Sequence, residues 1–336
     1  MTFDERVAAL APLGFTPRQT RFLVTAALHS GYCLRRQYLA FAGVRYGKNV
    51  RDFLDALVRR RLAQRFRYQP NRGHIYHIHA TSLYRALAQR DNRNRRHVSP
   101  ALIARKLMLL DYVLTVPGGA WYATEEDKVA LFTRELGIPL GDLPQREYAA
   151  MGRCGPTTTR YFIHKLPVYV APDRAVVHFV YLVNDETGHG LEQFLHDHVR
   201  LFSALPTWSV VAVCPRGLNG LPACRTVFDR FAATTWRPAP AEGIADVRWF
   251  FARRQLVERG DLRTLSVADI NRFRDARQRF ASAHMEALYG AWLAHGERAL
   301  AQGNDRAPDI PAPAAQLVLH ELPSTYSQFG SWPGVC

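Results

Sequence analysis

The sequence lacks the features of disulfide-stapled secreted domains, zinc ribbons and membrane-spanning chains. Its five cysteines are odd in number and include no C-x-x-C pair, which argues against a disulfide framework and a structural zinc site. No apolar run reaches the roughly 18 residues that a spanning helix requires. Asp4 and Glu5 stand where a secretory signal would be basic, so we expect a cytoplasmic protein with no membrane partner. We also expect no cofactor.

Acidic residues are scarce in one part of the chain. Residues 1–110 contain 21 Lys and Arg against 5 Asp and Glu, whereas residues 111–336 contain 23 against 24. The whole basic excess of the chain therefore lies in its first third. Such an asymmetry is typical of a polyanion-binding module joined to a neutral one, and nucleic acid is the commonest partner of such a module. A solvated basic surface that only improves solubility is the alternative.

The first third of the chain predicts three helices. Thr16 and Gln19 have the spacing of a capping box, and Pro17 suits the first helical position. Apolar residues recur at helical spacing after this point and again after Lys48. The predicted helices cover residues 17–30, 33–42 and 49–62.

A β-hairpin follows the third helix in the prediction. Residues 65–69 and 74–78 are aromatic and β-branched runs separated by Pro70-Asn71-Arg72-Gly73. Three helices and a hairpin, in this order, are typical of a winged helix-turn-helix that binds double-stranded DNA. A winged helix used for protein contacts is the alternative. The predicted DNA-binding residues are Arg45, Lys48, Asn49, Arg51, Arg59, Arg65, Arg67 and Arg72.

Two features of this region qualify the interpretation. Asp52 and Asp55 on the third helix repel phosphate, although each can hold an arginine in place. His74, His77 and His79 do not predict a metal site, because residues 77 and 79 share one face of a strand while 74 points away. No cysteine or carboxylate is placed to complete a tetrahedral site either.

The middle of the chain predicts helices over 98–115 and 125–136, and then an α/β segment. The first of these helices is a connector or a dimerisation helix, and we expect a homodimer. The later elements are strands over 160–170 and 175–184, a helix over 190–204 and a strand over 208–213.

This β-β-α-β order resembles the core of restriction-endonuclease-like folds, in which an aspartate begins the second strand and a D/E-x-K triplet ends it. Asp173 matches the aspartate, but Asn184-Asp185-Glu186 has no following lysine. We therefore expect a degenerate fold without catalytic residues. The alternative is a Mg²⁺-dependent DNA nuclease with a divergent PD-(D/E)xK site formed by Asp173, Asp185 and Glu186.

Together these segments resemble the replication-relaxation family of mobile genetic elements, in which a winged helix precedes a nuclease-like domain. The resemblance covers about residues 10–240 and rests on the Thr16–Gln19 segment, the basic third helix, the hairpin, Pro172-Asp173 and Asn184-Asp185. It implies a sequence-specific DNA-binding protein that regulates transcription, replication or transfer of such an element.

The expected fold class is α+β, with helices over 247–258 and 266–300 near the C-terminus. After Gln302 the chain is rich in Pro and Ala, so we expect an extended or disordered tail. The expected organisation is a winged helix over 1–97, a helical connector over 98–150, a nuclease-like domain over 151–245, a helical segment over 246–302 and a tail over 303–336.

Overall fold

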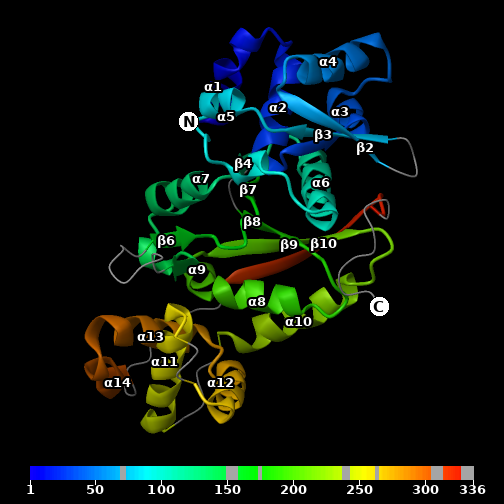
Figure 1. Cartoon of the computed structure of the whole chain (residues 1–336). Coiled ribbons are helices and arrows are strands. Elements are labelled where there is room, and N and C mark those ends of the chain that lie inside the picture. Colours follow the sequence, from blue (N-terminus) through cyan, green and yellow to red (C-terminus); the bar gives the residue numbers. More distant parts are fainter. Residues whose placement is uncertain are drawn as a thin grey trace.

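A computed structural model describes residues 1–68, 73–148, 158–172, 176–236, 243–261, 265–303 and 313–326. The fold is mixed α+β, as the sequence predicts. An N-terminal module lies at one end, a five-stranded sheet in the middle, and a group of helices at the other end (Figure 1). None of the described helices is long and apolar enough to cross a membrane.

The N-terminal module combines short helices with a three-stranded antiparallel sheet of order β1-β3-β2. The predicted first helix and hairpin are present, and the capping box of Thr16 and Gln19 begins α2. The elements are α1 (Phe3–Ala9), the 3-10 turn η1 (Ala11–Leu13), α2 (Pro17–His29), β1 (Tyr32–Leu34), α3 (Arg35–Ala42), α4 (Lys48–Arg59), β2 (Ala63–Tyr68), β3 (Gly73–Ile78), α5 (Thr81–Ala86) and the 3-10 turn η2 (Arg93–Arg95).

The second predicted helix was placed two residues too early. Tyr32–Leu34 form the strand β1, in which Cys33 pairs with Tyr76 of β3. This pairing joins segments more than 40 residues apart, so local periodicity did not reveal it. Gly31 turns the chain into β1 with a φ of 74°, and a Cβ there would lie 2.3 Å from the carbonyl oxygen of Asn94.

Helix α6 (Pro100–Thr115) lies between the N-terminal module and the central sheet (Figure 1). One hydrophobic cluster joins Leu107 and Met108 of α6 to Ile75 of the module and to Val180 and Val211 of the sheet. Because the helix packs against both parts, it connects the module to the sheet. This packing agrees with the connector alternative for residues 98–115, and a dimerisation role stays a prediction.

The predicted connector is only partly helical, because residues 120–122 form a strand of the central sheet. Its second helix is present, as α7 continued by a π-helical turn, η3. The elements after α6 are β4 (Ala120–Tyr122), α7 (Glu125–Ala130), η3 (Leu131–Glu135), the 3-10 turn η4 (Leu140–Asp142), and the two-stranded pair β5 (Gln145–Tyr148) and β6 (Thr158–Tyr161).

The central sheet has the order β10-β9-β8-β7-β4. Its strands β8, β9 and β10 are parallel, whereas β7 is antiparallel to both β8 and β4. Helices α8, α9 and α10 cover the face opposite α6. The elements are β7 (Val168–Val170), β8 (Val177–Leu182), α8 (His189–Asp197), α9 (Val199–Ser203), β9 (Thr207–Pro215) and α10 (Leu221–Thr234).

Four helices pack around a separate hydrophobic cluster that contains Phe250, Phe251 and Tyr289. They are α11 (Ile244–Arg259), α12 (Val267–Arg279), α13 (Ala283–His295) and α14 (Glu297–Gly303). The predicted tail is wrong for part of its length, because β10 (Ala314–Leu322) pairs with β9 in the central sheet. The segment before β10 is rich in Pro and Ala, and the partner of β10 lies about 100 residues earlier in the chain. The local sequence therefore did not indicate a strand here.

Candidate nucleic-acid interface

Helix α4 is amphipathic, with one face in the core and the opposite face in solvent. Val50, Phe53, Leu54 and Leu57 are buried in the core of the N-terminal module. The opposite face presents cations to solvent, and the first turn contains no acidic residue. The positive end of the helix dipole and the cationic side chains therefore lie together, an arrangement that favours an anion.

Five of the eight predicted DNA-binding residues are exposed cations without an ion pair or side-chain hydrogen bond to any described residue. They are Arg45, Lys48, Arg51, Arg59 and Arg67. Asn49 is exposed at the start of α4. Arg72 lies outside the described residues.

The eighth residue, Arg65, is held by an acid that sequence analysis had counted against DNA binding. Its Nη1 lies 3.4 Å from Oδ1 of Asp55 on α4, and both side chains are nearly half exposed. An exposed pair of this kind contributes little to folding. It connects β2 to α4, so the hairpin and the exposed face of α4 form one continuous surface.

Arginines lie near His74 at the end of the hairpin that is next to its turn. Arg67 is the register partner of His74, and Arg65, two residues away, is on the same face of the sheet. Arg35 begins α3, directly after the strand that pairs with β3. Partial burial lowers the pKa of His74, and the charges of Arg65, Arg67 and Arg35 lower it further. The charge of Asp55 opposes them. We call Arg35, Arg65 and Arg67 with His74 the arginine cluster.

Sequence analysis missed Arg35 because it could not distinguish it from its neighbour Arg36. The guanidinium of Arg35 lies 4.2 Å from the ring centroid of Tyr46, on the solvent side of the module. Arg36 instead donates two hydrogen bonds of 2.6 Å to the carboxylate of Asp111 on α6. One arginine is available to a ligand, and the other fixes α3 to α6.

Several other basic residues of the first third bind other groups of the protein. Arg6 donates hydrogen bonds of 2.9 and 2.8 Å to Asp127, and Arg18 donates one of 3.1 Å to the carbonyl of Ala42. Arg60 donates to the carbonyl of Leu13. Some of the cations that make up the basic excess are therefore already bound to other groups of the protein.

Two carboxylates of the nuclease alternative, Asp185 and Glu186, accept hydrogen bonds from nearby loop residues. Asp185 accepts one from the hydroxyl of Thr187 at 2.6 Å and two from the backbone of Thr187 and Gly188 at 2.8 and 3.0 Å, closing the turn that precedes α8. Partial burial raises its pKa, but the bonds from the Thr187 hydroxyl and the two backbone N–H groups outweigh that effect, so the pKa is lowered overall. Glu186 accepts from the backbone N–H of Asn219 at 3.1 Å.

Asp173 lies outside the described residues. Asp185 follows the C-terminal end of β8. Among the residues that the structure describes, no three His, Cys, Asp or Glu are grouped to hold a metal ion.

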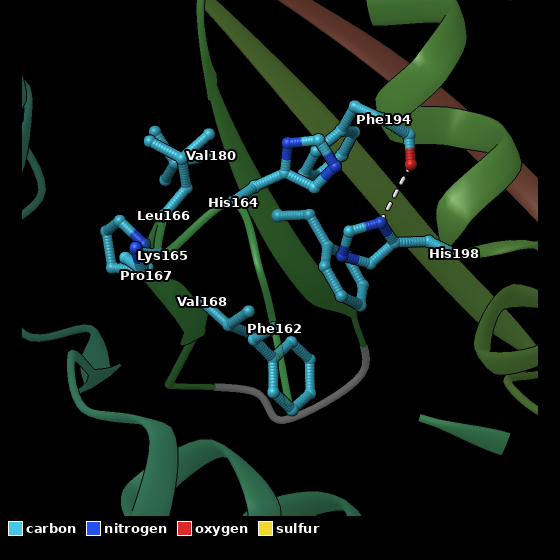
Figure 2. A pocket seen from close by; sticks show the side chains of 10 residues that line it. Phe162, His164, Lys165, Leu166, Pro167, Val168, Val180, Phe194 and His198 are labelled. Carbon is cyan, nitrogen blue, oxygen red and sulfur yellow. Dashed lines mark hydrogen bonds between the residues drawn. The ribbon is translucent and has the colours of Figure 1, made fainter. Parts of the chain in front are cut away.

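A small cavity lies between the loop before β7, β8 and α8 (Figure 2). At its edge, His164 Nε2 lies 2.8 Å from Asp197 Oδ2, and His198 Nδ1 lies 2.7 Å from the carbonyl oxygen of Phe194. Burial lowers the pKa of His198 to about 3, so this histidine is neutral at pH 7. The cavity has a volume of about 10 Å³, roughly that of one water molecule. It is too small for a nucleotide base.

Comparison of the chain with protein-family models, curated proteins and solved structures found no match.

Proposed function

We propose that the chain binds double-stranded DNA through residues 16–80, and that these residues form a winged helix-turn-helix. The observation that carries the proposal is the continuous surface formed by the five unpaired cations and the arginine cluster along α4 and the hairpin. Uncompensated positive charges repel one another, and a polyanion removes that repulsion.

The order of elements supports this assignment. Helix α2 is followed by β1, α3, α4 and the β2–β3 hairpin, with β1 on the outer side of β3. In such an arrangement α4 enters the major groove, where Asn49 and Arg51 face base edges. Arg67 and the cluster around His74 then contact the phosphate backbone.

We further propose a regulatory role, in transcription or in replication or transfer of a mobile genetic element. The lack of a lysine after Asn184-Asp185-Glu186, and the backbone hydrogen bonds that Asp185 and Glu186 accept, favour a degenerate nuclease-like domain over an active one. In this proposal the central sheet is a scaffold that positions the DNA-binding module through α6.

The test compares two double variants in DNA binding measured by fluorescence anisotropy. Arg51→Ala with Arg67→Ala removes one cation from α4 and one from the hairpin. We expect about 100-fold weaker binding, because each charge-assisted hydrogen bond contributes about 1.5 kcal/mol. Both side chains are exposed and unpaired among the described residues, so thermal stability should not change.

The matched control is Arg134→Ala with Arg248→Ala, which removes two exposed arginines from other parts of the molecule. We expect this variant to bind DNA like the wild type. Equal losses in the two double variants would mean that net charge alone drives binding. Unchanged affinity in the first variant would refute the proposed surface.

A further inference from the structure

The strand β10 forms one border of the central sheet, and no strand in the described part of the chain pairs with its outer edge. Its inner edge pairs with β9 over nine residues, from Ala314 opposite Thr207 to Leu322 opposite Pro215. The backbone N–H of Ala314 donates to the carbonyl of Pro206, and the carbonyl of Leu322 accepts from Arg216. Even-numbered residues therefore direct their backbone polar groups toward β9, and odd-numbered residues direct theirs outward.

Four residues consequently present eight backbone polar groups at the outer edge: Ala315, Leu317, Leu319 and Glu321. Among the described residues only one of these groups has a partner, the carbonyl of Leu317, which accepts from Arg225 at 3.5 Å. Unpaired edges of this length are usually blocked by proline, lysine or a bulge. This edge has no proline and no lysine, and it exposes 42% of Val318 and 37% of Leu319.

We propose that β10 pairs with β10 of a second copy of this chain, antiparallel about a two-fold axis at Val318. In this register the whole length of β10 pairs with the second copy. Leu317 stands opposite Leu319 of the second copy, and Ala315 stands opposite Glu321, so all eight outward groups are hydrogen-bonded. Val318 faces its own copy across the axis in a pair without backbone hydrogen bonds, where the two side chains lie closest.

The charges along the strand fit the same register. Glu321 is the one ionised side chain in β10 at pH 7, and its partner is Ala315, so no like charges face each other. Glu321 of the second copy lies on the face that carries Leu317, which α10 covers and where Arg225 is located. The guanidinium of Arg225, which also lies 3.9 Å from Asp229, can exchange its weak contact with the Leu317 carbonyl for an ion pair across the interface. Its partner there, Glu321 of the second copy, would then be shared with Arg216 of its own chain, which lies 3.8 Å away.

This interface does not depend on DNA binding, and it joins two copies of the chain through their central sheets. A continuous ten-stranded sheet results from the two five-stranded sheets. The pairing gives hydrogen-bond partners to main-chain groups that have none among the described residues, and it covers Val318 and Leu319.

The first test measures molecular mass in solution by light scattering over a range of concentrations. We expect a dimer for the wild-type chain and at least about tenfold weaker dimerisation for Val318→Lys, which places two ammonium groups opposite each other. The control is Val267→Lys, which changes an equally apolar and more exposed side chain on α12 and should leave dimerisation unchanged. A monomer at all concentrations up to about 100 µM, the range of a weak complex, would overturn the proposal.

The second test fixes the register by disulfide crosslinking. Val318→Cys, in a chain whose Cys154 and Cys336 are replaced by Ser, should form a covalent dimer on mild oxidation, because facing Cα atoms in this kind of pair lie about 4.5 Å apart. Leu319→Cys is the control, since it stands opposite Leu317 and not opposite itself. A dimer in which neither Val318→Lys nor Val318→Cys has an effect would place the interface elsewhere and refute the proposed pairing.

Discussion

The N-terminal module and the C-terminal helices α11–α14 are both rich in arginine, but several of these arginines differ in their partners. In the C-terminal helices three arginines are paired with nearby acids: Arg248 lies 2.7 Å from Glu297, Arg254 lies 2.6 Å from Glu286, and Arg272 lies 2.9 Å from Asp246. On α4, the loop before it and the hairpin, Arg51, Arg45 and Arg67 have no such partner among the described residues. The number of basic residues in a region therefore does not show how many of its cations are free to meet a ligand.

The largest expected effect is a loss of folding stability when a buried ion pair of the C-terminal helices is broken. Glu286 accepts two hydrogen bonds from Arg254, at 2.6 and 2.8 Å, and both side chains are mostly buried. We expect Glu286→Ala to destabilise the fold by about 3 kcal/mol in urea unfolding, because it leaves a partly buried guanidinium with fewer partners. Glu297→Ala breaks an exposed pair and should cost less than about 1 kcal/mol. Equal effects would contradict the distinction between buried and exposed pairs.

Acidification should affect the N-terminal module strongly. Burial lowers the pKa of His29 to about 3, opposed by Asp127 and assisted by Arg6 and Lys128. Because the pKa is near 6.5 in the unfolded chain, the unfolded state binds the proton more tightly, and stability falls as pH decreases from about 6.5 toward 3. The loss approaches about 1.4 kcal/mol per pH unit for this group.

The variant His29→Gln should reduce the change of unfolding free energy with pH by about 1.4 kcal/mol per pH unit. The measurement is urea unfolding at several pH values. The control is His284→Gln on α13, which should change the pH dependence less. Burial also lowers the pKa of His284, but this side chain is much less enclosed than His29. A wild-type slope that His29→Gln leaves unchanged would assign the acid sensitivity to other groups.

The smallest expected effect concerns the acid within the proposed interface. Asp55→Asn removes the carboxylate that pairs with Arg65, so DNA affinity should rise by about threefold, with a change in stability below about 1 kcal/mol. Asp229→Asn breaks a similar exposed pair with Arg225 on α10 and should not change DNA affinity. A decrease in affinity for Asp55→Asn would show instead that Asp55 positions Arg65 for the ligand.

Local signals predicted part of this fold, and long-range pairings explain what they missed. The capping box at Thr16 and the aromatic and β-branched runs of β2 and β3 are local signals, which act within a few residues. β1 and β10 depend on partners far along the chain, so their sequences alone did not identify them. The same holds for the neighbours Arg35 and Arg36 in the candidate interface. Their sequence does not show that Arg36 pairs with Asp111 while Arg35 lies against Tyr46, because Asp111 is far along the chain.

The salt dependence of DNA binding tests the central claim most directly. Each phosphate neutralised by a protein cation releases counterions, so the logarithm of the affinity falls with the logarithm of salt concentration by about 0.9 per contact. Five unpaired cations predict a slope of about −4.5 for the wild-type chain, reduced by about 2 in Arg51→Ala with Arg67→Ala. A slope near zero, or one that this double variant leaves unchanged, would contradict DNA binding by this surface.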